Sequence, residues 1–419
     1  MKVRLILCAL CFFVPVRGFA ADEGCLLRST QDILDCALRN HPEVAQAQAI
    51  RERDSALQRV ARQRPNPELE GKIVSGSDAV HTVLSTETSL LHTLELGGKR
   101  RARIRQATAQ GEFSAASLLE AKELVALNTV LALHRLRQIR SESAYLQESS
   151  TTFDRILRQF RSRSVLPPEQ SVSLSVFDLA KDEYNLRKKS LLEEETELKT
   201  FLEIATGVPF SQMKGLLPKR RGAWPKIASD PEEFGPESSA SEIKKAAADL
   251  KRAEAGLSLA KSNAWPDFKL GPTVETGTLG RNDSVTVGGT ISLPIPILNL
   301  NRGEKAYAAM EKTRASSQLE FTRKKIVLER AKQLARYQNA VKGVSQIHWG
   351  DLNKKHHEVE DFFDRGLVPS SLVIESHRQF FEITRIVHEQ ELTATDALWR
   401  LYIIDGKVFD ETIWAGAFL

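Results

Sequence analysis

The sequence predicts a mainly helical chain with a small β part, built from two copies of a strand–strand–helix–helix unit. Residues 112–166 contain neither glycine nor proline, which is typical of a very long helix. Residues 285–297 alternate apolar with polar or small side chains, which is the period of a β-strand. Glycines and prolines also recur at matching boundaries about 200 residues apart, which indicates an internal repeat. The matching pairs are Pro67 with Pro266, Gly98 with Gly303, Pro167 with Pro369, and Gly207 with Gly406.

Residues 1–20 have the features of a secretory signal peptide. Lys2 and Arg4 precede an apolar run, and Gly18-Phe19-Ala20 forms a small-residue cleavage site. The apolar run is too short to span a membrane comfortably, so we expect cleavage rather than an anchor. The signal carries three basic and no acidic residues, so the net charge falls from +5 to +5 − 3 = +2. This near balance, without a basic tail, argues against a nucleic-acid binder.

Two cysteines, Cys25 and Cys36, remain after cleavage, in what should be an oxidising compartment. If one helix held both, their 11-residue separation would span about 16 Å, too far for a disulfide. With Thr30 as a helix cap, however, an irregular segment before it could fold back onto Cys36. A disulfide and two inert thiols are therefore both open.

The first repeat is expected to occupy residues 21–207, and the second residues 241–407. In each, a helix, two strands, a long helix and a return helix follow one another. The expected ranges are 42–64, 67–76, 82–96, 99–164 and 169–206 in the first repeat, and 241–264, 267–278, 285–297, 304–364 and 370–405 in the second. Residues 208–240, rich in proline and glycine, form a linker that could pack as a belt along the helices, and 408–419 form a tail.

The expected dimensions favour a membrane-associated oligomer. Each long helix would measure roughly 90–100 Å, more than a compact domain can hold. The mature chain has no apolar run of 18 residues. Four strands cannot close a barrel in lipid, whereas three chains would supply twelve. Strand period alone is equally compatible with a half-buried strand of a soluble sandwich.

The strand-to-helix junctions are expected at Gly97, Gly98 and Gly303. A basic cluster follows the first junction, comprising Lys99, Arg100, Arg101, Arg103 and Arg105. Cations at a helix N-terminus oppose the helix dipole, so we expect anionic lipid head groups to meet them. An ordinary solvated run of charges is the alternative.

These features resemble the TolC-like outer membrane efflux proteins over residues 30–407. The resemblance rests on the duplicated halves, the paired hairpin tips, "NHPEVAQAQA" (40–49), "LELGGKR" (94–100) and "SLPIPILNLNRG" (292–303). "LELGGKR" looks closest to the CzcC-like cation-efflux branch.

The resemblance implies a passive, non-enzymatic homotrimeric conduit in the cell outer membrane, with a large periplasmic portion. It would dock on a periplasmic adaptor (membrane fusion) protein and an inner-membrane pump of the RND type. Heavy-metal cations are the expected cargo, with multidrug efflux or type I protein secretion as alternatives. A periplasmic coiled-coil adaptor is a more distant alternative, because an adaptor should have a single hairpin.

The same resemblance implies roles for individual residues. Leu166, Pro167, Gly366, Leu367 and Val368 would form the adaptor-docking tips. Two positions depart from the family pattern: Ser162-Arg163-Ser164 replaces a usual glycine, and Leu372 falls where an acid is expected.

Glu375 would be the periplasmic gate, because its spacing from Gly366 places it where the family has an acid lining the entrance. A ring of three Glu375 carboxylates would favour cations, and mutual repulsion would raise their pKa.

Catalytic and metal motifs are not evident in the sequence. There is no nucleotide loop, zinc-type cysteine and histidine spacing or nucleophile elbow, so no cofactor is expected. His356 and His357, with Glu358, Glu360 and Asp361, are the only metal-like cluster. Adjacent histidines on a helix point about 100° apart and rarely bind one ion together, so no metal site is predicted. His377 is expected to point away from Glu375.

Overall fold

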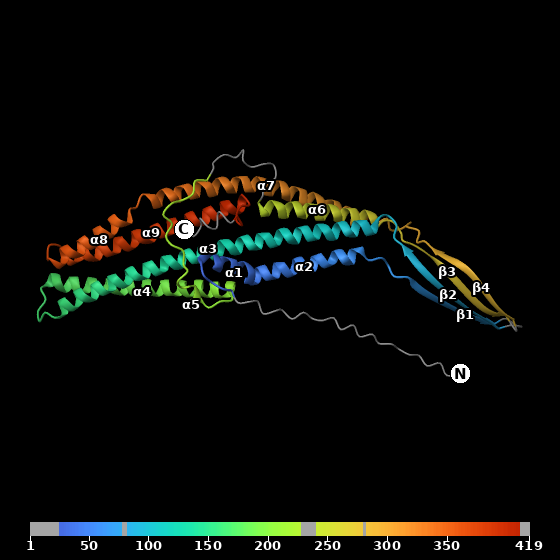
Figure 1. Cartoon of the computed structure of the whole chain (residues 1–419), viewed down its shortest axis with the longest axis horizontal. Coiled ribbons are helices and arrows are strands. Elements are labelled where there is room, and N and C mark those ends of the chain that lie inside the picture. The colour runs from blue at the N-terminus through green and yellow to red at the C-terminus, as the bar shows by residue number, and fades with distance from the viewer. Residues whose placement is uncertain (1–24, 78–81, 228–239, 280–281, 411–419) are drawn as a thin grey trace, which may run out of the picture.

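The chain is an elongated body with helices along most of its length and a small sheet at one end (Figure 1). The computed structural model describes residues 25–77, 82–227, 240–279 and 282–410. The predicted signal peptide lies outside the described residues, as do 228–239 of the linker and 411–419 of the tail.

The predicted fold class is confirmed, with the same order of elements in both repeats. The first repeat contains α1 (Thr30–Asn40), α2 (Pro42–Arg62), β1 (Glu68–Ser77), β2 (Thr82–Leu94), α3 (Lys99–Arg161) and α4 (Pro168–Thr206). The second contains α6 (Ser241–Ser262), β3 (Phe268–Leu279), β4 (Asn282–Ser292), α7 (Arg302–Ser345), α8 (Trp349–Asp364) and α9 (Ser370–Ile404). A short helix, α5 (Phe210–Met213), lies between them. None of the described helices combines the length and apolar composition needed to cross a membrane.

Helix α1 begins one residue earlier than expected, at a capping box. The Ser29 side chain accepts a hydrogen bond from the Asp32 backbone, and the Asp32 carboxylate accepts one from the Ser29 backbone. The chain before this cap folds back, and Cys25 forms a disulfide with Cys36 across a Cα–Cα distance of 5.9 Å. The disulfide therefore ties the start of the described chain to α1.

The prediction of one long helix over 304–364 is wrong, because the structure divides this segment into two helices. Helix α7 ends at Ser345 and α8 begins at Trp349, with His348 in an extended conformation. The residues around the break are poor helix formers: Gly343, Val344, Ile347 and Gly350. Helix α3, the counterpart in the first repeat, runs unbroken for 63 residues.

The four strands form one antiparallel sheet in the order β1-β2-β3-β4, so β2 of the first repeat pairs with β3 of the second. The strand predicted over 285–297 stops at Ser292, paired with Lys269. Pro294 and Pro296 follow, and a proline has no N–H to continue the ladder. The apolar alternation therefore continues five residues beyond the last paired residue.

The segment after α4 crosses the helices, as Figure 1 shows for the trace between α5 and α7. Phe210 and Met213 pack into a buried cluster with Leu133 of α3. Farther along, the ring of Trp224 lies 6.1 Å from that of Tyr337 on α7, and the Tyr337 hydroxyl donates to the Pro225 carbonyl. The described part of the linker thus packs against both repeats partway along the body.

Candidate functional site

The sheet has one apolar and one polar face. Antiparallel register places these apolar side chains on a single face: Leu69, Ile73, Leu90, Leu270, Val274, Val285, Val287 and Ile291. They are largely open to the surroundings, with Ile73 74 % and Val287 73 % exposed. An exposed apolar surface of this kind marks contact with lipid or with another protein.

The opposite face of the sheet carries charges and hydroxyls that bind one another. Lys269 on β3 pairs with Glu68 at 2.6 Å, and Ser85 donates to Glu275 at 2.7 Å. Nearer the middle, the hydroxyls of Ser89 and Thr273 lie 2.7 Å apart and both side chains are buried. This face suits an aqueous interior, whereas the apolar face does not.

The two strand-to-helix junctions use different residues. Gly97 and Gly98 adopt φ of 68° and 71°, a region that favours glycine, and a Cβ on Gly97 would lie 2.5 Å from the Trp265 ring. In the second repeat the corresponding left-handed residue is Asn301, with φ of 55°. Gly303, the residue expected at this junction, lies in the first turn of α7 with open space around it, two residues after the left-handed Asn301. Asparagine tolerates this region, and the Asn301 amide also donates to the Ala260 carbonyl at 3.0 Å.

The basic cluster after Gly98 is largely paired within the chain. Lys99 bonds Asp267 at 2.6 Å, Arg103 pairs with Glu95, and Arg100 donates to the Arg62 carbonyl at 3.0 Å. The sequence led us to expect anionic lipid head groups as the partners of these basic side chains. In the structure, groups of the protein itself take that place.

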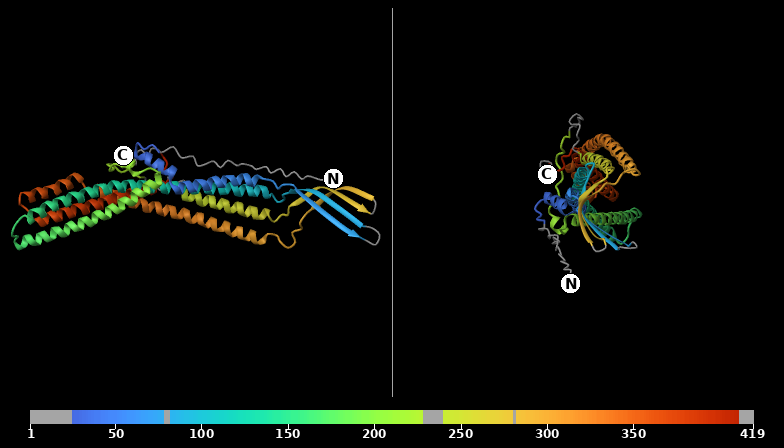
Figure 2. Two further views of the ribbon diagram at one scale, coloured as in Figure 1. Left: turned by 90° about the horizontal axis from the view of Figure 1, so that it is seen from below. Right: turned by 90° about the vertical axis from the view of Figure 1, so that its right-hand side faces the viewer.

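The two hairpin tips lie together at the end opposite the sheet (Figures 1 and 2). Gly366, with φ of 69°, ends α8, and the N–H of Leu367 bonds back to the Phe362 carbonyl at 2.9 Å. Leu367 is 66 % exposed, and Val368 is half-buried.

The first tip turns without glycine. Pro167 caps α4, Leu166 is half-buried, and Val165 is 82 % exposed. The most exposed apolar side chain of this tip is therefore Val165, which lies one residue before those predicted.

Glu375 lies on the exposed side of α9, close to the second tip. It accepts hydrogen bonds from Gln379 at 2.7 Å and from Arg378 at 2.6 Å. These bonds lower the pKa of Glu375, Gln379 having the larger effect. Within one chain the direction is opposite to that expected for a ring of unpaired carboxylates. Leu372, at the position where an acid was expected, is also exposed.

A buried polar layer joins the two repeats midway along the helices. The Glu142 carboxylate on α3 lies 2.7 Å from His388 Nδ1 of α9 and 2.9 Å from the Arg135 guanidinium. The same guanidinium lies 2.6 Å from the Glu194 carboxylate of α4. Burial alone would raise the pKa of Glu142, but the hydrogen bonds from His388 and Arg135 outweigh it and lower that pKa. The layer is an electrostatic link among three helices.

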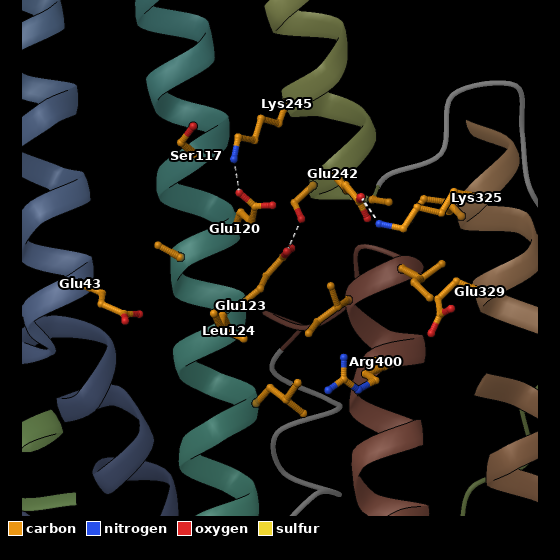
Figure 3. A pocket seen from close by; sticks show the side chains of 17 residues that line it. Glu43, Ser117, Glu120, Glu123, Leu124, Glu242, Lys245, Lys325, Glu329 and Arg400 are labelled. Atoms are coloured by element: carbon orange, nitrogen blue, oxygen red, sulfur yellow. Dashed lines mark hydrogen bonds and ion pairs between the residues drawn. The ribbon is translucent and has the colours of Figure 1, made fainter. Parts of the chain in front are cut away.

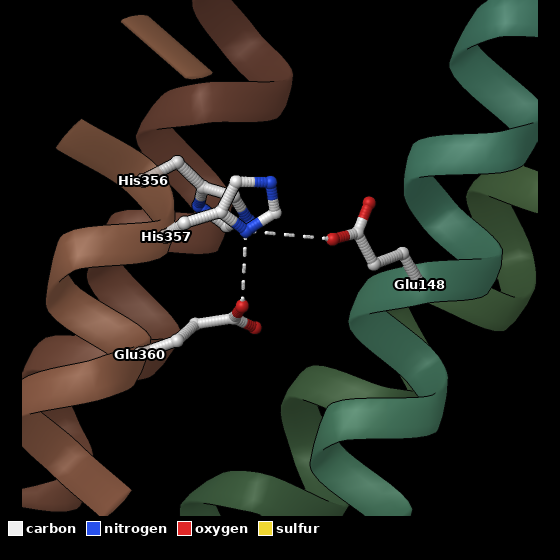
Figure 4. A group of neighbouring side chains, drawn as sticks. All are labelled: Glu148, His356, His357 and Glu360. Atoms are coloured by element: carbon white, nitrogen blue, oxygen red, sulfur yellow. Dashed lines mark hydrogen bonds and ion pairs between the residues drawn. The ribbon is translucent and has the colours of Figure 1, made fainter. Parts of the chain in front are cut away.

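A second polar group gathers nearer the tips (Figure 4). Glu148 of α3 faces His356, His357 and Glu360 of α8, and one ligand atom of each lies within 4.8 Å of the others. Burial lowers the pKa of His356 to about 4. The ring centroids of His356 and His357 lie 5.3 Å apart, so both imidazoles reach the same group although the residues are adjacent on one helix.

His377 of α9 supports this group from behind. Its Nε2 lies 3.0 Å from Glu360 Oε1, and its Nδ1 lies 2.8 Å from Ser149 Oγ. The bond from His377 lowers the pKa of Glu360 to about 2. The order serine–histidine–carboxylate resembles a catalytic triad, but Ser149 and His377 are only 4 % and 1 % exposed. No substrate could reach the serine.

An open pocket of about 690 Å³ lies where α3, α6, α7 and α9 meet (Figure 3). Its charges are mostly paired: Lys245 with Glu120 and Lys325 with Glu242, both at 2.6 Å. Glu123 is buried, which raises its pKa to about 7 despite a hydrogen bond from Ser241. The Lys245–Glu120 pair joins helices of the two repeats, and the Lys325–Glu242 pair joins two helices of the second.

Comparison with solved structures identifies the fold. The chain is similar to the CmeC outer membrane channel of Campylobacter jejuni, with a TM-score of 0.70 and 14 % identity over 93 % of this chain and 89 % of that one. It is similar to the outer membrane protein VceC of Vibrio cholerae, with a TM-score of 0.65 and 15 % identity over 91 % and 97 % of the two chains. It is also similar to CusC, whose structures describe transmembrane channel formation, with a TM-score of 0.65 and 15 % identity over 94 % and 95 %. No protein-family model matches the chain, and no curated protein matches it in sequence. The chain therefore shares the fold of these channels.

Proposed function

We propose that this protein is the outer-membrane channel of a tripartite efflux system, a passive trimeric conduit from periplasm to exterior. The observation that carries the proposal is the two-faced sheet, with exposed apolar residues on one side and paired charges on the other. Lipid satisfies the first face and water the second. The similarity to CmeC, described as an outer membrane channel, supports the same reading over nearly the whole chain.

The trimer follows from counting strands. One chain supplies four strands in an open sheet, and unpaired edges are not tolerated in lipid. Three chains supply 3 × 4 = 12, an even number that can close around an aqueous lumen. The helices would continue this lumen into the periplasm, with the tips at its entrance.

The tips are the proposed docking surface for a periplasmic adaptor, which would connect the channel to an inner-membrane pump of the RND type. The proposed docking residues lie between α3 and α4 and between α8 and α9, and Figure 1 shows these hairpin ends opposite the sheet, where a partner from the inner membrane would arrive. They are Leu166, Pro167, Gly366, Leu367 and Val368. Glu375 is the proposed gate residue, and its bond to Arg378 makes the pair, rather than a lone carboxylate, the group that would face the entrance.

Heavy-metal cations are the proposed cargo, on the resemblance of residues 94–100 to the cation-efflux branch. Organic compounds or a secreted protein are the alternatives. Survival of a deletion strain on zinc, cadmium, cobalt, nickel, copper and silver salts, with dyes, detergents and antibiotics in parallel, separates them. If the deletion strain is sensitive to metals alone, the proposal of a metal cargo is supported. If it is sensitive to organic compounds alone, that proposal is overturned and the channel proposal stands.

Membrane fractionation tests the channel itself. An SDS-resistant trimer in the outer membrane is the expected result. A soluble or inner-membrane protein would instead favour the non-channel alternative, a periplasmic coiled-coil adaptor.

A further inference from the structure

The group formed by Glu148, His356, His357 and Glu360 has the composition of a cation site. Two imidazoles and two carboxylates are ligands typical of Zn²⁺ and related first-row divalent ions. The residues come from two helices of different repeats, α3 and α8, so their convergence is a property of the tertiary fold rather than of one helix face.

The distances from His357 to the two carboxylates are close to those between ligands of one ion, and the shorter one is a long hydrogen bond. His357 Nδ1 lies 3.4 Å from Glu360 Oε2 and 4.0 Å from Glu148 Oε1. Two ligands of a tetrahedral zinc ion are about 3.3 Å apart. The Glu148 side chain is 41 % exposed and can therefore move the remaining distance without disturbing the core.

His356 is a buried ligand candidate. It is 4 % exposed, its ring stacks on Phe380 with centroids 4.5 Å apart, and its Nδ1 has no hydrogen-bond partner among the described residues. One ring nitrogen of His356 is among the four converging ligand atoms, so a bound ion would give this buried ring a polar partner.

The carboxylate of Glu360 is already held in place. Thr152 donates to its Oε1 at 3.1 Å, and His377 lies 3.0 Å from the same oxygen. Its other oxygen, Oε2, faces His357. Supporting contacts of this kind orient the ligands of metal sites. His357, with its side chain 53 % exposed, leaves an entry path from solvent.

We propose that Glu148, His356, His357 and Glu360 bind one divalent first-row transition-metal ion per chain, with Zn²⁺ as the representative ion. The ion would join the first hairpin to the second close to the tips, and it would hold α8 against α3 beyond the α7–α8 break. This proposal concerns an ion held by the chain itself and does not depend on the cargo.

The test is Zn²⁺ titration of the purified full-length protein in detergent, with any histidine tag removed, followed by calorimetry. The expected result is one ion per chain. His357→Ala and Glu148→Gln change exposed side chains and should each weaken binding by more than the roughly 10–100-fold cost of losing a supporting contact. His377 is a positioning residue, so His377→Gln should weaken Zn²⁺ binding by a factor within that roughly 10–100-fold range.

Matched controls lie on or beside the same helix. His348→Ala and Glu358→Gln remove an exposed histidine and an exposed glutamate outside the group, and both should bind Zn²⁺ like the wild type. His356→Phe keeps a ring against Phe380 and should lose binding while remaining folded.

Amide hydrogen exchange supplies a second readout. Zn²⁺ should slow exchange in α8 of the wild type and leave α8 of His357→Ala unchanged. Equal Zn²⁺ affinity in wild type, His357→Ala and Glu148→Gln would overturn the proposal, as would the absence of any binding. Either result would leave the channel proposal standing, because its test is membrane localisation.

Discussion

Both repeats contain a helix, two strands, a long helical segment and a return helix in this order. They differ in the residues found at corresponding places. Where the strand meets the long helix, the first repeat uses Gly97 and Gly98, and the second uses Asn301. The first long helix is continuous, and the second is divided into α7 and α8. Among the described residues, a disulfide-tied helix, α1, precedes α2 in the first repeat, and no counterpart of it precedes α6. The backbone path is thus retained while the residues that enforce it have diverged.

The largest expected effect separates two strand glycines, Gly71 in β1 and Gly271 in β3, which lie on opposite faces of the sheet. A Cβ on Gly271 would lie 1.8 Å from the Leu90 carbonyl oxygen, whereas nothing lies within 4 Å of one on Gly71. Gly271→Val should therefore separate β2 from β3 and abolish assembled protein in the membrane fraction. Gly71→Val should assemble nearly normally. Equal assembly of both variants would show that the close approach at Gly271 is not required.

The polar layer between the repeats gives the next largest effect. Glu142→Gln removes a buried carboxylate that bonds Arg135 and His388, while Arg135 keeps its bond to Glu194, so the change should cost about 3 kcal/mol of unfolding free energy, the lower end for a broken buried pair. Glu389→Gln, on an exposed part of α9, should change it by less than about 0.5 kcal/mol. Urea denaturation of the detergent-solubilised protein measures both.

The same variant has a defined pH dependence. The pKa of Glu142 is lower in the folded chain than its ordinary value of 4.5. Its contribution to stability is therefore complete above pH 4.5 and is lost as the pH falls through the lowered pKa. The difference in unfolding free energy between wild type and Glu142→Gln should shrink below about pH 4.5, and a difference that stays constant as the pH falls well below 4.5 would contradict this assignment.

Reduction of the disulfide tests what α1 adds to the first repeat alone. Cross-linking residues 11 apart should stabilise the fold by about 3 kcal/mol. Cys25→Ser with Cys36→Ser should accelerate hydrogen exchange in α1 and leave α6 unchanged. Dithiothreitol should reproduce this change in the wild type and have no effect on the double variant.

The smallest effects compare the two junctions. Gly97→Ala places a Cβ at positive φ and against Trp265, at a cost of about 1–3 kcal/mol. Gly303→Ala replaces a helical glycine in open space and should stabilise by roughly 0.5–1 kcal/mol. The midpoint of thermal denaturation should therefore fall for Gly97→Ala and rise for Gly303→Ala. A fall for both variants would contradict the assignment of Gly303 to an unconstrained helical position.

Local patterns in the sequence predicted most of the fold. Helix propensity, proline and glycine positions and strand alternation are properties of neighbouring residues, so the starts of α2, α3 and α4 could be placed within one residue. The α7–α8 break could not, because a single glycine such as Gly343 is tolerated within many helices. The turn at Asn301 was missed because Gly303, two residues later, offered the more familiar signal.

The candidate sites depended on contacts that local patterns do not contain. Glu148 and His356 are more than 200 residues apart in the sequence, and only the packing of α3 against the second hairpin brings them together. The partner of Lys99 in the basic cluster, Asp267, likewise comes from the other repeat, whereas Arg103 and Arg100 find theirs in the first repeat. From residue types alone, we therefore expected lipid head groups to meet the basic cluster and predicted no metal site at His356 and His357.

The pairing of β2 with β3 has an evolutionary consequence. Because β3 is the second repeat's equivalent of β1, the edge of β2 already matches the leading strand of another copy of the same unit. A chain only one repeat long would carry complementary edges on its two strands, so identical copies could be added around a ring by one rotation. Fusion of two such genes would convert an intermolecular contact into an intramolecular one and halve the number of subunits. Each half would then be free to acquire features, such as α1 or the α7–α8 break, that a symmetric ancestor would have had to repeat at every position.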